Sequence, residues 1–187
     1  HDDPPGDMPL ATHTLPRRLG ECGYTCAAVG RLAVDPAAAL GFAHTERIEP
    51  TLPGREHDDY HAWLAGQGLH NQVDAWDHAA RDSAPATYHR SFGALRATLP
   101  ERAHATTWVG DRAVRWLQHA REPFCLWVGF TKPRHPFDPP APWDALYAPA
   151  ALPLPPGFRL PVAEEDCGPG AHFDPHAMTE ARMRRVL

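Results

Sequence analysis

Two adjacent side chains that could handle an anion and a proton, Arg134 and His135, lie in a proline-rich segment that follows an apolar run. Residues 124–130 are apolar throughout, which predicts a strand buried on both faces, as in the interior of a parallel sheet. Chemistry in open parallel sheets gathers where strands end, so we expect Arg134, His135 and the nearby Lys132 at such an end. The prolines around them fix the backbone and cannot extend a sheet.

The elements that must position these residues alternate between helix and strand. Thr14 predicts the cap of a short helix that Gly23 ends, and residues 24–34 then read as a buried strand with a turn at Gly30. A second helix, over residues 105–121 and ended by Pro123, precedes the apolar strand at 124–130. This repeated order predicts an α/β fold with a mainly parallel sheet.

Other segments are less regular. A helix is predicted near residues 59–68, and another begins after a cap at Thr179. Residues 69–100 give no clear assignment. Ten prolines between positions 133 and 161 predict an extended loop packed over a surface.

Composition excludes several function classes. The 18 basic and 23 acidic residues give a net charge of −5, with no basic run suited to nucleic acid. No apolar segment is long enough to span a membrane, so we expect a soluble protein without nucleic-acid or membrane partners, in the cytoplasm somewhat more than the periplasm. The four cysteines have no framework spacing and are expected to be free thiols.

Several short motifs follow one another along the chain. A helix runs into Gly23-Tyr24-Thr25, a strand ends at Val29-Gly30-Arg31, Leu40-Gly41-Phe42 follows, and a helix from Thr107 precedes Pro123-Phe124. The sequence Arg134-His135-Pro136-Phe137-Asp138-Pro139-Pro140 then follows the strand. Over about residues 12–50 and 100–160 the chain resembles the sulfatase family of the alkaline-phosphatase-like superfamily.

The resemblance implies a three-layer α/β/α sandwich with a mainly parallel sheet, of which residues 1–187 would be an internal piece of the catalytic domain, truncated at both ends. It implies a small-molecule sulfate ester as substrate. Arg31 stands where the family has a lysine and, with Lys132, would bind the substrate anion. Arg134 stands where the family has a histidine, so its acid role would pass to His135, and Ala33 stands where a second histidine is expected.

The family's nucleophile is a formylglycine made from the Cys or Ser of a Cys/Ser-x-Pro-x-Arg motif. It lies beside a divalent cation, for which calcium is the first candidate. None of the four cysteines is followed by x-Pro-x-Arg, and the metal ligands of the family fall outside the matched segments. We therefore expect no metal ligands and no activity in this chain alone. The full-length parent is expected to be a sulfuric ester hydrolase. Two alternatives within the fold are a degenerate homologue that binds anions without turnover and a phosphonate or phosphate ester hydrolase.

A third alternative belongs to a different class. His57 and His61 lie four residues apart with carboxylates between them, a spacing that can hold a metal ion. The chain has 13 histidines, so a polar helix face explains this spacing as well. A histidine-rich metal-binding domain stays open as a hypothesis at this point.

Overall fold

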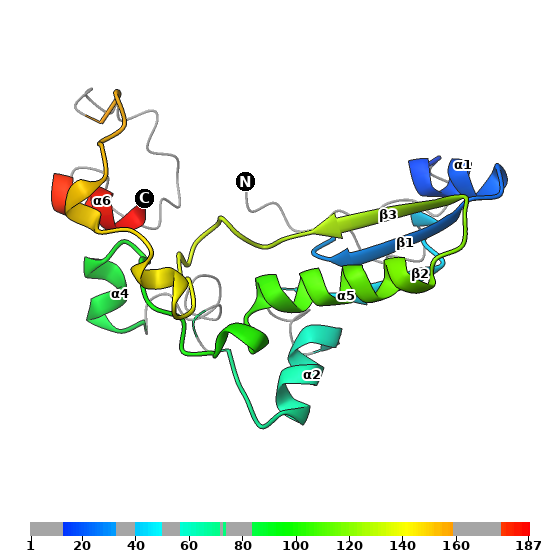
Figure 1. Ribbon diagram of the computed structural model, residues 1–187, viewed down its shortest axis with the longest axis horizontal. Helices are drawn as coiled ribbons and strands as arrows, with labels where there is room; N and C mark the ends of the chain where they lie inside the picture. The colour runs from blue at the N-terminus through cyan, green and yellow to red at the C-terminus, as the bar shows by residue number, and fades with distance from the viewer. Residues whose placement is uncertain (1–12, 33–39, 50–56, 72, 74–83, 159–176) are drawn as a thin grey trace.

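The computed structural model has one parallel sheet at its centre (Figure 1). The residues that the structure describes are 13–32, 40–49, 57–71, 73, 84–158 and 177–187. The strands β1 (Thr25–Gly30), β2 (His44–Arg47) and β3 (Phe124–Gly129) lie in the order β2-β1-β3. Gly30 pairs with Arg47 on one side and with Gly129 on the other, so the carboxyl ends of the three strands meet at one edge.

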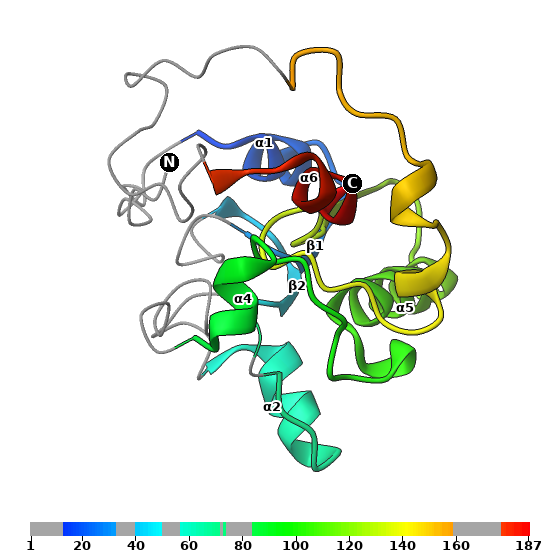
Figure 2. The ribbon, with the colours of Figure 1, turned by 90° about the vertical axis from the view of Figure 1, so that its left-hand side faces the viewer.

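The helices surround this sheet. They are α1 (Leu15–Glu21), α2 (Asp59–Gly66), α4 (Ala86–Arg90), α5 (Ala105–His119) and α6 (Glu180–Val186), with single turns at Glu101–Ala103, Trp143–Ala145 and Pro149–Ala151. Figures 1 and 2 show α4 and α6 beyond the carboxyl ends of the strands and α1 near the amino ends. No described helix has the length and apolar character that crossing a membrane requires.

The two faces of β1 are covered by different helices, because successive side chains of a strand point to opposite faces. Val29 packs in the main core with Val109 and Ala113 of α5. On the other face Ala28 packs with Leu32 and Phe42, and the Cys26 thiol donates to the carbonyl oxygen of Pro16 in α1 at 3.3 Å. This arrangement confirms the α/β fold with a parallel sheet.

The longest described helix, α5, supplies four of the ten buried residues of the main core. Trp108, Val109 and Ala113 lie on its buried face, as the apolar spacing predicts. Burying a side chain of the size of Val109 stabilises the fold by about 1.5–3 kcal/mol. The hydroxyl of the fully buried Tyr60 donates to the carbonyl oxygen of Ala103 at 2.9 Å, which ties α2 to the start of α5.

The prediction that residues 124–130 form an interior strand buried on both faces is wrong for the described part of the chain. β3 is a strand and is parallel to β1, but it lies at the edge of the sheet. Trp127 is 54% exposed and Phe130 48%, and no described strand pairs with the outer edge of β3. Trp127 is therefore not buried as the predicted interior strand required.

The structure confirms the predicted helix caps and adds two elements that were not predicted. Thr14 and Thr179 cap α1 and α6 as predicted, and the thiols of Cys22, Cys26 and Cys125 are free. β2 was not predicted, because its sequence is polar. α4 occupies part of the unassigned segment 69–100.

Candidate functional site

The carboxyl ends of β1 and β3 approach each other closely. Gly30 has a φ of +98°, and a Cβ at this position would collide with the carbonyl oxygen of Gly129. The backbone N–H of Arg31 donates to that same oxygen at 2.8 Å. Glycine at position 30 thus permits both the left-handed turn and the close approach, and it sets Arg31 directly at the end of the sheet.

Arg31 follows the last residue of β1 directly. Its side chain is half-buried, and its Nε is buried with no hydrogen-bond partner among the residues that the structure describes. The indole N–H of Trp127 donates to the Arg31 carbonyl oxygen at 3.3 Å, so β3 also holds the backbone here. A buried N–H without an acceptor costs free energy, and an oxyanion supplies the missing acceptor.

A second charged side chain, Glu49, lies past the end of β2. Burial raises the pKa of Glu49, and the positive charges of Arg47 and Arg31 offset part of this rise. The Arg47 guanidinium lies 3.3 Å from Glu49 Oε1. Arg31 therefore shares its surroundings with a carboxyl group that is easier to protonate than an ordinary glutamate.

Lys132 is held inside the loop that follows β3. Its ammonium group donates to the carbonyl oxygen of Pro136 at 2.6 Å and forms a short ion pair with the buried carboxylate of Asp138. His104, which caps α5, places its Nε2 4.0 Å from the other oxygen of Asp138. Because His104 Nδ1 accepts from the Thr106 N–H at 3.3 Å, Nε2 carries the hydrogen that faces Asp138.

His135 lies against α4. Its Nε2 is 3.2 Å from the carbonyl oxygen of Phe92, and its ring centre is 4.2 Å from that of Phe137. A carbonyl oxygen can only accept, so Nε2 carries a hydrogen. A proton that His135 gives to another group would therefore come from Nδ1.

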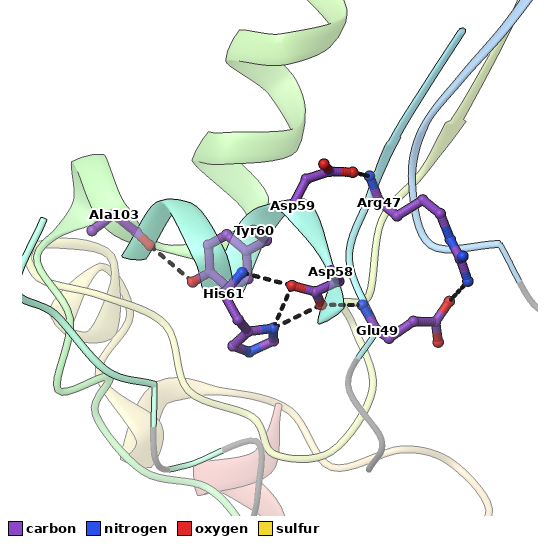
Figure 3. Close-up of polar contacts among 7 residues, drawn as sticks. All are labelled: Arg47, Glu49, Asp58, Asp59, Tyr60, His61 and Ala103. Carbon is purple, nitrogen blue, oxygen red and sulfur yellow. Dashed lines mark hydrogen bonds and ion pairs between the residues drawn. The ribbon is translucent and has the colours of Figure 1, made fainter. Parts of the chain in front are cut away.

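Asp58 and Asp59 hold the chain where β2 ends, as Figure 3 shows. Asp58 Oδ2 accepts from the Glu49 N–H at 2.6 Å, and Asp59 Oδ2 accepts from the Arg47 N–H at 2.7 Å. Between them, the Ile48 N–H donates to the Gly30 carbonyl oxygen at 3.3 Å. The two carboxylates at the start of α2 thus satisfy N–H groups on the outer side of β2 that a neighbouring strand would otherwise take.

Asp58 also binds His61. Asp58 Oδ1 accepts from the His61 backbone N–H at 2.6 Å, and the ring Nδ1 lies 2.7 Å from Oδ2. His57 is exposed. In the part of the chain that the structure describes, no three His, Cys, Asp or Glu side chains are grouped to hold a metal ion. His61 is therefore held by the cap residue of α2, and the described residues supply no ligand set for the metal-binding hypothesis.

The predicted site residues occupy two places. Arg31 lies at the end of β1, while Lys132 and His135 lie in the loop after β3, each with its own partners. Arg134 is half-buried in the same loop, and Ala33 lies outside the described residues. No role was predicted for Asp138, Glu49 or His104, because an isolated acid or histidine carries no spacing signal and these contacts join distant parts of the chain.

A shallow pocket of about 420 Å³ lies at the opposite, amino end of the sheet. Arg115 and His119, at the end of α5, line it together with Arg121. Cations at this end of a helix complement its dipole, so their presence has a structural cause. The carboxyl ends of the strands, with the unpartnered Arg31 Nε, remain the better candidate.

Comparison with known proteins agrees with the fold and the motifs. No established family model matches the sequence. The multifunctional alkaline phosphatase superfamily protein PehA of Trinickia caryophylli is 27% identical over 128 residues, 66% of this chain and 23% of that protein. An arylsulfatase of Clostridium perfringens is 25% identical over 158 residues, 76% of this chain and 31% of that protein.

A solved structure extends the comparison to the fold. The phosphonate monoester hydrolase SpPMH of Silicibacter pomeroyi superposes with a TM-score of 0.61 at 16% identity. The superposition covers 98% of this chain and 41% of that one, so the chain spans less than half of the relatives it matches. The ordered motifs, these two relatives and the shared fold together support a relationship of the chain to the sulfatase/alkaline-phosphatase-like family.

Proposed function

We propose that the full-length protein is a hydrolase of small anionic esters, with sulfate monoesters as the first candidate substrates. The observation that carries this proposal is the buried, unpartnered Nε of Arg31 at the carboxyl end of β1. The leaving oxygen and the nonbridging oxygens of such an ester gain negative charge as the ester bond breaks. A positioned guanidinium stabilises that charge and can bind two oxygens at once.

The relatives support the reaction class and leave the ester open. One relative is named as an arylsulfatase, and the structural neighbour is a phosphonate monoester hydrolase. Phosphonate or phosphate esters are therefore the alternative substrates. All three present an oxyanion to Arg31, so the specificity between them rests on groups beyond this residue.

The resemblance implies formylglycine and a divalent cation, most simply calcium, in the full-length protein. The described residues offer no ligand set for a cation. The proposed contribution of this chain is accordingly to bind and orient the anion through Arg31, and to place His135 in the loop after β3 as a proton donor.

A non-catalytic, anion-binding homologue is the second candidate. The ammonium group of Lys132, which was expected to bind substrate, is paired with Asp138 and Pro136 inside the loop. If this pairing persists in the whole protein, Arg31 would be left to bind the anion without the help of Lys132. Turnover by the full-length protein separates the two candidates.

The test is steady-state kinetics of the full-length protein on an aryl sulfate, an aryl phosphonate monoester and an aryl phosphate. Arg31→Ala should lower kcat/KM on the preferred ester by about 100-fold or more, a usual loss for one oxyanion contact. Arg18→Ala is the matched control, because Arg18 is exposed and pairs with Glu21 on α1. Turnover that Arg31→Ala leaves unchanged would refute the assignment. Absence of turnover on all three esters would favour the non-catalytic candidate.

A further inference from the structure

Two thiols lie side by side on neighbouring strands. Cys26 of β1 and Cys125 of β3 are register partners in the parallel ladder. Register partners on parallel strands point to the same face, with backbones about 4.8 Å apart. Disulfides join residues whose Cα atoms are about 4.4–6.8 Å apart, so the backbone spacing suits an S–S bond.

The two thiols differ in access. Cys26 is 2% exposed, and its thiol donates to the Pro16 carbonyl oxygen at 3.3 Å. Burial, with a smaller contribution from Cys125, raises the pKa of Cys26 above that of an ordinary thiol. Cys125 is only half-buried and lies on the edge strand. A reagent from solvent therefore reaches Cys125 first.

We propose that Cys125 is a thiol-oxidation site for small-molecule disulfides and that Cys26 is its resolving partner, so that oxidation closes a disulfide between β1 and β3. This inference goes beyond the proposed hydrolase function and does not depend on it. The pair needs no group from outside the chain except the oxidant.

The oxidation proceeds in two exchange steps. The Cys125 thiolate attacks one sulfur of an oxidised glutathione, breaks its S–S bond, forms a mixed disulfide and releases one glutathione thiolate. The Cys26 thiol loses its proton to solvent and attacks Cys125 Sγ, which releases the second glutathione. The two protein thiols lose two electrons and two protons in total. The oxidised glutathione gains two electrons and two protons and becomes two molecules of glutathione.

The disulfide would join the strands whose carboxyl ends lead to Arg31 and to the loop of Lys132. It would close a long loop of the chain, which restricts the unfolded state. The midpoint of thermal unfolding should rise by about 5–10 °C in the oxidised form.

The experiment uses the chain with Cys22→Ser and Cys167→Ser, which leaves only Cys26 and Cys125. After incubation with oxidised glutathione, the remaining thiols are alkylated and the peptides are mapped by mass spectrometry. The expected product is the cross-linked pair of peptides containing Cys26 and Cys125, lighter by two hydrogens, with a raised unfolding midpoint that dithiothreitol reverses.

Two further variants in the same background separate the roles. Cys26→Ala should stop at a glutathione adduct on Cys125, whereas Cys125→Ala should gain little adduct because Cys26 is buried. Circular dichroism confirms that each variant is folded. A stable glutathione adduct on Cys125 without any cross-link while Cys26 is present would overturn the resolving role. Absence of any modification at Cys125 would overturn the site itself.

Discussion

Arg31 is the residue on which the proposed function depends, because its Nε is buried without an acceptor among the described residues at the place where parallel strands end. Sequence analysis predicted a role for this position only from the family resemblance, in which Arg31 stands where the family has a lysine. The same reasoning assigned Lys132 to the substrate, yet its ammonium group is paired with Asp138. Types and spacing identify a cation, but only the folded chain shows which cations already have a counter-ion.

The proton donor can be tested on the full-length protein. His135→Ala should lower turnover of esters with poor leaving groups by about two to four orders of magnitude, the usual range for a general acid, and affect activated aryl esters much less. Arg134→Ala should weaken the binding of both kinds of ester alike, because an arginine cannot donate a proton near neutral pH and can act only on the anion. Equal losses for both leaving groups in His135→Ala would contradict the acid role.

Glu49 gives a pH-dependent prediction for stability. Its pKa is raised in the folded chain, so the folded state binds more protons than the unfolded state between the ordinary value of about 4.5 and the raised one. Stability is therefore lost as the pH rises through that window. Glu49→Gln should remove this loss. The free energy of unfolding of the variant, measured with urea, should therefore exceed that of the unmodified chain by an amount that grows with pH. Glu122→Gln, at an exposed position, is the control, and an equal pH profile for both variants would contradict the account.

At the scale of elements, the start of α2 supports the edge of the sheet. Asp58 caps α2 by accepting from the His61 N–H, and it also accepts a hydrogen bond from the Glu49 N–H. Asp58→Ala should reduce the free energy of unfolding by about 2–4 kcal/mol, since a cap and charged hydrogen bonds are lost together. Thr179→Ala, which removes the exposed cap of α6, should cost at most about 1 kcal/mol. Similar losses in the two variants, measured by urea unfolding, would show that Asp58 is no more than a cap.

The elements also show what the sequence could predict. Helices α1, α5 and α6 were found from their caps and apolar spacing, and β1 and β3 from their apolar runs. β2 was missed because the edge strand His44-Thr45-Glu46-Arg47 contains no apolar residue. The N–H groups of Arg47 and Glu49 on its outer side are bound by the carboxylates of Asp59 and Asp58, twelve and nine residues away in the chain, and no local pattern shows this. The burial of β3 was overestimated, since composition reports that a strand is apolar but not which neighbours cover it.

For the whole molecule, the fold could be predicted further than the site. Alternation of helix and strand was enough for a parallel α/β sheet, and the motif order was enough for the family. The site depends on contacts between distant segments, such as Lys132 with Asp138 and His135 with Phe92, which no local pattern reveals. The superposition covers 98% of this chain and 41% of its structural neighbour, so the chain spans less than half the length of that protein.

The central claim is that Arg31 binds an oxyanion at the carboxyl ends of the strands, and nuclear magnetic resonance of its guanidinium tests this most directly. Titration of the chain with sulfate, at ionic strength held constant with chloride, should shift the Arg31 Nε–H signal in a saturable way. The Arg18 signal should follow only a weak, unsaturated drift, and Arg31→Ala should abolish saturable binding measured by calorimetry. An Arg31 signal that does not move with sulfate, or moves no more than that of Arg18, would contradict the account.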